Sequence, residues 1–172
     1  IFVIPGFGQE WQNVQQLRVH LVMDIDPGHG GMDGGASARD GTQEKDINLA
    51  ISMALAEEAE KYGVETVLTR EDREGLYSEE NHSGRWSKIE DMKERKRIIE
   101  ETDPDLTVSI HLNNFLQDPD VYGAQVFYPE DSAEDVLEEN KDIAKRIQRA
   151  LTEGLDDGSN RIVLPKSGIY LF

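Results

Sequence analysis

Three side chains in this sequence have the chemistry to share one metal ion: His29, Glu44 and His111. His29 lies in a glycine-rich loop directly after a hydrophobic run, and His111 ends a run in which apolar and polar residues alternate. Two imidazoles and one carboxylate form a ligand set found in catalytic zinc sites, and they leave one coordination position open. A single histidine at such a position is more often a surface or structural residue, so the prediction depends on all three residues occurring together.

The positions of these residues depend on the elements that carry them. Hydrophobic periodicity predicts alternating strands and helices, which favours an α/β fold: a three-layer sandwich with a mostly parallel sheet and helices on both faces. The carboxyl ends of parallel strands, and the helix starts that follow them, lie on one edge of such a sheet. Strands are expected over residues 19–25, 64–69, 106–110 and 123–128, helices over 44–62, 87–102 and 136–157, and a last strand over 169–172.

Local signals set some of these limits. Ser87 and Glu90 have the spacing of a capping box, which predicts a helix start at Ser87. Pro104 requires that the same helix end before it. Residues 1–18 have no clear period and are interpreted as an N-terminal extension outside the core. Residues 19–172 are interpreted as one catalytic domain that is incomplete at its C-terminus, because the last hydrophobic run stops where a buried strand should continue.

Composition excludes several classes of partner and chemistry. The 172 residues include 35 acidic and 18 basic side chains, a formal net charge of −17. Nucleic acid and anionic membrane surfaces are therefore unfavourable partners. The absence of cysteine excludes disulfides, thiol catalysis and cysteine-ligated zinc. No apolar run in the sequence is long enough to span a membrane, and no export signal is visible.

The glycine-rich loop also raises the alternative of nucleotide binding. Residues 28–33 fail the G-x-G-x-x-G pattern at its last position, and the lysine of a Walker motif is absent. Glycines that let the backbone turn tightly around a metal-binding histidine are the better physical explanation.

The sequence resembles the zinc-dependent N-acetylmuramoyl-L-alanine amidases of the family-3 type. The motifs that carry the resemblance are DPGHGG at 26–31, EKD at 44–46, LTR at 68–70 and SIHLN at 109–113. The segments at 39–42, 46–49 and 123–128 look most like the subgroup that acts on the spore cortex. The resemblance covers about residues 19–172, and its first and last motifs are the most specific.

The resemblance implies roles for individual residues. His29, Glu44 and His111 match the zinc ligands of the family. Asn113 matches a position beside the metal, where it would bind substrate, orient a ligand or have a purely structural role. Arg70 and Arg95 match recurrent family arginines, which we interpret as structural ion-pair residues.

The resemblance also implies the reaction, zinc-dependent hydrolysis of the amide bond between N-acetylmuramic acid and L-alanine in peptidoglycan. The family's general-base glutamate lies on a strand after the point that corresponds to Phe172, so no catalytic residue besides the zinc ligands is assigned here. Three nearby acids, Asp26, Asp33 and Asp40, could in principle substitute. We expect Asp26 to shape the turn, and Asp33 and Asp40 to lie on backbone too flexible to fix a distance.

Two alternatives stay open. One is a non-catalytic module that binds the cell wall or a protein and keeps zinc as a structural ion. The other is a different zinc peptidase of the cell wall. Family resemblance further implies an extracytoplasmic location, in the wall or spore cortex, and it allows regulation by a protein activator.

Overall fold

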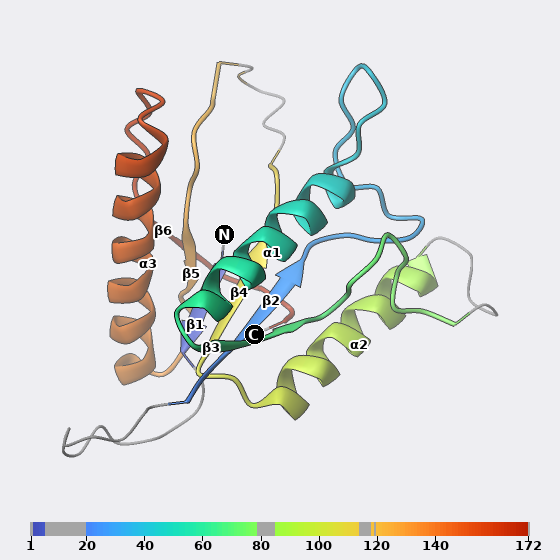
Figure 1. Cartoon of the computed structure of the whole chain (residues 1–172), viewed down its shortest axis with the longest axis horizontal. Helices are drawn as coiled ribbons and strands as arrows, with labels where there is room; N and C mark the ends of the chain where they lie inside the picture. Colours follow the sequence, from blue (N-terminus) through green and yellow to red (C-terminus); the bar gives the residue numbers. More distant parts are fainter. Residues whose placement is uncertain (1, 6–19, 79–84, 114–117, 119, 172) are drawn as a thin grey trace.

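A computed structural model of the chain describes residues 2–5, 20–78, 85–113, 118 and 120–171. Its elements alternate along the chain much as the sequence predicts (Figure 1). The strands are β1 (Phe2–Pro5), β2 (Leu21–Pro27), β3 (Val64–Leu68), β4 (Leu106–Ile110), β5 (Phe127–Pro129) and β6 (Leu164–Lys166), and the helices are α1 (Glu44–Lys61), α2 (Arg85–Thr102) and α3 (Glu134–Leu155).

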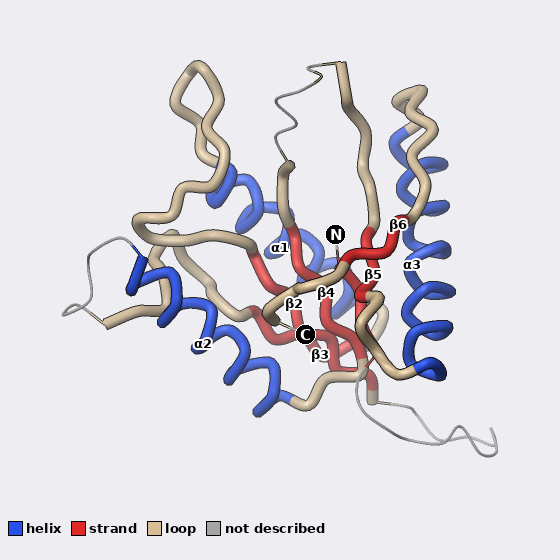
Figure 2. Tube along the Cα trace, turned by 180° about the vertical axis from the view of Figure 1, so that it is seen from behind, coloured by secondary structure: helices blue, strands red, loops and turns tan. Residues whose placement is uncertain are grey.

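The strands form one sheet in the order β3-β2-β4-β1-β5-β6. Neighbouring strands are parallel except for β1 and β4, which run antiparallel. In Figure 1, α3 and α2 lie toward opposite ends of the sheet, and α1 crosses in front of it. Figure 2 shows the sheet from behind, with α1 on its far side. The expected α/β fold with a mostly parallel sheet is confirmed.

One face of the sheet is apolar. Strand side chains alternate between the two faces, so Met23 and Ile25 of β2 share a face with Val108 and Ile110 of β4. These residues form a buried cluster with Ala56 of α1 and side chains of α3. The partly buried residues packed against this cluster are Leu55, Ala59, Val64, Leu68, Leu106, Tyr128, Ile143, Ile147, Leu151 and Val163. Helices α1 and α3 therefore cover the apolar face.

The opposite face is polar and equally buried. Asp24 and Asp26 of β2 alternate with the apolar residues just described, and Thr107 and Ser109 of β4 lie beside them. Helix α2 covers this face with a stripe of buried residues at every fourth position, namely Ser87, Asp91, Arg95 and Ile99. The two-faced alternation predicted for 106–110 is thus confirmed, with both faces enclosed. None of the helices in the described ranges is long and apolar enough to cross a bilayer.

The N-terminal segment departs from the prediction. Residues 2–5, expected outside the core, form strand β1 in the interior of the sheet, where Phe2 pairs with Ser109 and with Phe127. A short strand needs only open backbone donors and acceptors beside it, so a lack of periodicity in the sequence does not exclude pairing. Residues 1 and 6–18, the rest of the expected extension, lie outside the described residues.

Three local expectations also need correction. Helix α2 is already formed at Arg85, so Ser87 is an internal, buried residue and not the N-cap. The strand expected at 123–128 is shorter and later, Phe127–Pro129. The last strand is Leu164–Lys166, whereas the segment expected to be a strand, 169–172, holds a turn at Tyr170 and Leu171.

Helix α1 buries a different face from the one that its hydrophobic residues suggest. Ile47 and Ile51 are 36% and 42% exposed, whereas Glu44, Asn48 and Ser52 are buried. A helix normally turns its apolar stripe to the core. Here the buried stripe includes polar residues that contact the loop after β2, and this contact decides the rotation of α1.

Asp24 is the most unusual member of the polar face. Its side chain is fully buried, and neither carboxylate oxygen has a hydrogen-bond partner among the described residues. Burial, together with the negative charge of Asp26, raises the pKa of Asp24 to about 7. The folded protein therefore holds Asp24 protonated under mildly acidic conditions, because the charged form would be buried without compensation.

Replacing Asp24 by Asn should change how stability depends on pH. The folded pKa is raised from 3.8 to about 7, so the folded state binds more protons between these values, and this group's contribution to stability falls as pH rises through that window. We expect Asp24→Asn to gain stability relative to the wild type from pH 4 to pH 8, by roughly 4 kcal/mol at most. Urea unfolding at several pH values measures this difference.

The matched control is Asp120→Asn, which changes an exposed aspartate. A constant difference in unfolding free energy between Asp24→Asn and the wild type across this pH range would contradict the interpretation.

Candidate metal centre

His29 lies in the loop that follows β2, and the backbone there is unusual. Its φ of 64° lies in the left-handed region, which few non-glycine residues adopt. Gly28, just before it, packs so closely on His111 that a Cβ atom at position 28 would lie 2.2 Å from Cε1 of that ring. Only glycine fits this contact, so the glycine-rich loop serves to bring the backbone against the second histidine.

Two buried arginines hold the carbonyl groups of this loop. Arg70 donates from Nε to the carbonyls of Pro27 (3.0 Å) and His29 (2.7 Å), and from Nη2 to that of Gly28 (3.2 Å). Arg95 donates to the carbonyls of Pro27 (2.8 Å) and His29 (2.6 Å). These donors satisfy carbonyls that have left the strand ladder, and they fix the backbone that carries His29.

Arg95 is also the centre of a buried ion-pair network. It contacts Asp26 at 2.6 Å and Asp91 at 2.6 Å, with 1% of its side chain exposed. Burial alone would raise the pKa of Asp26, but Arg95 and the hydroxyls of Thr69 and Ser109 lower it overall. The structural ion-pair role expected for Arg95 is therefore seen, whereas Arg70 acts by hydrogen bonds to backbone carbonyls.

Glu44 is the first residue of α1, and its carboxylate is held by two backbone N–H groups. Its Oε2 accepts the N–H of Ala36 (2.8 Å), and its Oε1 accepts the N–H of Leu112 (2.8 Å). Burial would raise the pKa of Glu44, but these hydrogen bonds and the neighbouring His29 outweigh burial and lower it. Asn48, one turn later, donates to the carbonyl of Gly28 at 3.1 Å and so ties α1 to the loop.

The three predicted residues meet at one point. Nε2 of His29 and Nδ1 of His111 each lie 3.3 Å from Oε1 of Glu44, and one ligand atom from each residue lies within 4.8 Å of the others. The rings of His29 and His111 are 4.9 Å apart and nearly perpendicular. Burial and the charge of His29 lower the pKa of His111, which favours the neutral imidazole that a metal ion requires.

These distances can be compared with those of a tetrahedral zinc site. Two donors bound at the usual Zn–N and Zn–O lengths lie roughly 3.3–3.4 Å apart. Both histidine-to-glutamate distances have this value. The second oxygen of Glu44 and the second nitrogen of His29 are also occupied by hydrogen-bond partners, as ligands of a metal usually are. The residues therefore fit such an ion.

Asp33 behaves differently from the expectation that its backbone is flexible. It forms an isolated bridge with Gly30, with N–H···O distances of 3.0 Å in both directions. Its carboxylate lies 3.1 Å from Nδ1 of His29 and 2.9 Å from Nζ of Lys88. Burial would raise the pKa of Asp33, but Lys88 and His29 lower it.

The other residues named from the sequence do not belong to the group of three ligand-capable side chains. Asn113 is exposed, two residues beyond His111, so its predicted role in substrate binding stays a prediction. Asp40 is exposed, and its carboxylate accepts the N–H of Thr42 at 3.0 Å. The carboxylate of Asp26 binds Arg95, Thr69 and Ser109 on the polar face of the sheet.

A cavity of 560 Å³ opens beside the metal-capable residues. Its lining includes His29 and His111 together with Lys88 and Met92 of α2. Leu171 completes the lining from the C-terminal segment. Sequence reasoning missed Lys88 and Leu171, because nothing in their local pattern indicates which cavity they line.

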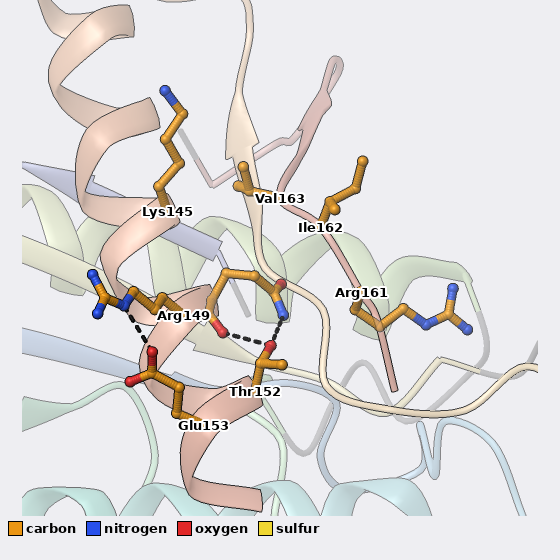
Figure 3. A pocket seen from close by; sticks show the side chains of 8 residues that line it. Lys145, Arg149, Thr152, Glu153, Arg161, Ile162 and Val163 are labelled. Atoms are coloured by element: carbon orange, nitrogen blue, oxygen red, sulfur yellow. Dashed lines mark hydrogen bonds and ion pairs between the residues drawn. The ribbon is translucent and has the colours of Figure 1, made fainter. Parts of the chain in front are cut away.

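A second, shallower hollow of 380 Å³ lies between α3 and residues 161–163 (Figure 3). Lys145, Arg149 and Arg161 surround it, and Arg149 pairs with Glu153 at 2.8 Å. None of the three ligand-capable residues lines this hollow, whereas His29 and His111 line the first cavity, which is therefore the candidate active site.

Comparison with solved structures places this geometry among amidases. The CwlD amidase from Clostridioides difficile, solved in complex with the GerS lipoprotein, is 44% identical, with a TM-score of 0.81 over 88% of this chain and 75% of that chain. The N-acetylmuramoyl-L-alanine amidase AmiC2 of Nostoc punctiforme is 28% identical, with a TM-score of 0.67 over 88% of this chain and 72% of that chain.

Sequence comparison agrees with the structural one. The germination-specific N-acetylmuramoyl-L-alanine amidase of Bacillus subtilis (strain 168) is 33% identical over 150 residues, which are 87% of this chain and 60% of the relative. This chain thus spans less than two thirds of that protein's length. The family model described as N-acetylmuramoyl-L-alanine amidase matches residues 23–170. The chain therefore belongs to the N-acetylmuramoyl-L-alanine amidase family.

Proposed function

We propose that this protein is a zinc-dependent amidase that hydrolyses the bond between N-acetylmuramic acid and L-alanine in peptidoglycan. The observation that carries the proposal is the pair of 3.3 Å distances from Glu44 to His29 and His111, which suit one tetrahedral ion. Membership of the amidase family supports the reaction. Similarity to a germination-specific amidase supports the spore cortex as the substrate.

In this proposal His29, Glu44 and His111 hold the zinc ion. When bound in such a site, zinc supplies Lewis acidity, which activates water at neutral pH and polarises the amide carbonyl. Glu44 stays ionised because backbone N–H groups bind both of its oxygens. The cavity beside the two histidines would receive the glycan and stem peptide. Asn113, exposed and two residues beyond His111, is proposed to contact substrate.

Proton transfer needs a further group. Asp26 is bound to Arg95, and Asp33 is bound to His29 and Lys88, so neither carboxylate is available to accept a proton from water. Asp40 is exposed, and its carboxylate accepts the N–H of Thr42. We therefore keep the family's glutamate, which no residue of this sequence matches, as the proposed general base.

The proposed location and partner follow from the relatives. Peptidoglycan lies outside the cytoplasmic membrane, so we propose that the protein acts extracytoplasmically, in the wall or the spore cortex. A neighbour at 44% identity was solved in complex with a lipoprotein. We propose that this protein, too, acts with a protein partner that activates it.

Removal of any one ligand should abolish zinc binding. His29→Ala, Glu44→Ala and His111→Ala each take one donor from a three-residue site, so we expect zinc content to fall from about one ion per chain to below roughly a tenth. Metal analysis after dialysis against a weak chelator measures this content. His20→Ala is the control, because His20 is exposed and pairs with Glu65. Full zinc retention by any of the three variants would remove that residue from the set.

Adding one methyl group at Gly28 should also weaken zinc binding. A Cβ atom there would lie 2.4 Å from Nε2 of His111, so the ring must move. We expect Gly28→Ala to lower zinc affinity by at least roughly tenfold, as displacement of a ligand's support does. Chelator competition measures this affinity. Gly154→Ala on α3 is the control, because nothing lies within 4 Å of its added Cβ, and equal affinities for the two variants would refute the steric role.

Hydrolysis itself should depend on the metal residues. We expect the full-length protein to release new L-alanine amino termini from purified sacculi, and His111→Ala to lower the rate by at least roughly 100-fold. Mass analysis of the muropeptide products identifies the bond that is cut. Cleavage between amino acids would instead indicate a zinc peptidase. Binding to sacculi without any product would indicate a non-catalytic module.

A further inference from the structure

The ring of His29 has two nitrogens in different surroundings. Nε2 lies 3.3 Å from Glu44 and faces the ligand-capable cluster. Nδ1, on the other side of the ring, lies 3.1 Å from Oδ2 of Asp33. A neutral histidine carries one proton, and the partner of one nitrogen decides which nitrogen keeps its lone pair. Both nitrogens therefore face a carboxylate oxygen, but Asp33 is the closer one, and Oε1 of Glu44 already accepts the N–H of Leu112 at 2.8 Å. Asp33 thus favours the proton on Nδ1, which leaves the lone pair of Nε2 for a metal.

Asp33 is held firmly enough to do this. Its backbone is bridged to Gly30 in both directions at 3.0 Å. Its Oδ1 accepts the N–H of Gly35 at 3.3 Å, and its Oδ2 is 2.9 Å from Nζ of Lys88. The backbone of Asp33 is thus fixed by the bridge to Gly30, and its carboxylate is held by the N–H of Gly35 and by Lys88 of α2.

Lys88 adds a connection across the cavity. It lies on α2, whereas Asp33 and His29 lie on the loop after β2, and both Lys88 and Asp33 line the cavity beside the metal-capable residues. Arg95, also on α2, binds the backbone carbonyl of His29 at 2.6 Å. Helix α2 therefore contacts His29 by two routes, one through its carbonyl and one through the carboxylate that faces its ring.

We propose that Asp33 is a positioning residue that orients the imidazole of His29 for the metal, and that Lys88 holds Asp33 in place, so that α2 influences metal affinity. This inference rests on the proposed function, because it assumes that His29 is a zinc ligand. Carboxylates that face the outer nitrogen of a metal-binding histidine fix its tautomer and its orientation, and their loss typically weakens metal binding by about 10–100-fold.

The test compares zinc affinity among the wild type and four variants by chelator competition at fixed pH, with zinc alone as the ligand. We expect Asp33→Asn and Asp33→Ala to weaken zinc binding by about 10–100-fold. The side chain of Lys88 is 61% exposed, so water screens its ion pair with Asp33. Lys88→Met should therefore weaken zinc binding by at most about fivefold. Asp40→Asn is the matched control, since Asp40 lies on the same loop, is exposed and accepts the N–H of nearby Thr42.

A second measurement separates orientation from general loss of structure. In the metal-free protein, nitrogen NMR should show His29 as the Nδ1–H tautomer in the wild type and a mixture of tautomers in Asp33→Ala. Circular dichroism checks that each variant is folded; should Asp33→Ala fail to fold, Asp33→Asn carries the same comparison.

Each outcome decides a different question. If the wild type binds zinc, and Asp33→Asn binds it as tightly as Asp40→Asn, the role of Asp33 is overturned while the proposed function stands. An unchanged tautomer in Asp33→Ala would overturn it equally. If the wild type fails to bind zinc at all, both this inference and the proposed function fall.

Discussion

The buried ion pair between Arg95 and Asp26 is the interaction on which the rest of the structure depends. Both side chains are 1% exposed and meet at 2.6 Å. Removing one member of such a pair leaves an unpaired buried charge and typically costs about 3–5 kcal/mol. Asp26 anchors the end of β2, and Arg95 lies in the middle of α2. The pair therefore fixes the helix against the strand whose following loop carries His29.

The guanidinium of Arg95 also supplies hydrogen bonds to backbone carbonyls that have no partner in a neighbouring strand at the end of β2. Carbonyls that leave a sheet in a buried place need donors, because an unpaired buried polar group costs free energy. Arg95 and Arg70 provide these donors to consecutive carbonyls of the loop. An apolar helix face could have covered the sheet, but it could not have supplied donors to the backbone that carries His29.

Sequence reasoning succeeded where one residue type implies one physical requirement. Histidines and a glutamate at strand ends and helix starts predicted the metal-capable cluster, because parallel topology brings those ends to one edge. Hydrophobic alternation located β2, β3 and β4 within two residues at either end. Pro104 correctly limited α2, which ends at Thr102.

The wrong expectations for the buried faces of the helices have a common cause, the burial of polar residues. Periodicity assumes that the apolar stripe of a helix faces inward, yet α1 buries Glu44, Asn48 and Ser52 and leaves Ile51 exposed. On α2 the buried residues include Asp91 and Arg95, which a hydrophobic pattern predicts to be exposed to solvent. Strand β1 was missed for another reason: its pairing with β4 is set by distant backbone groups, and four residues are too few for a pattern.

The division of the sheet into an apolar and a polar face explains how one small domain combines stability with a fixed site. The apolar face, under α1 and α3, supplies most of the hydrophobic burial, which is non-directional and tolerates small shifts. Metal ligation does not tolerate such shifts, since donors must lie within tenths of an ångström of their places. Directional hydrogen bonds and ion pairs meet this requirement. They come from Arg95 and Asp91 of α2 on the polar face, and from Glu44 and Asn48 at the start of α1. The uncompensated burial of Asp24 on the polar face is consistent with this division. A buried carboxyl group without a partner lowers the free energy of unfolding, and hydrophobic burial on the opposite face of the sheet offsets this loss.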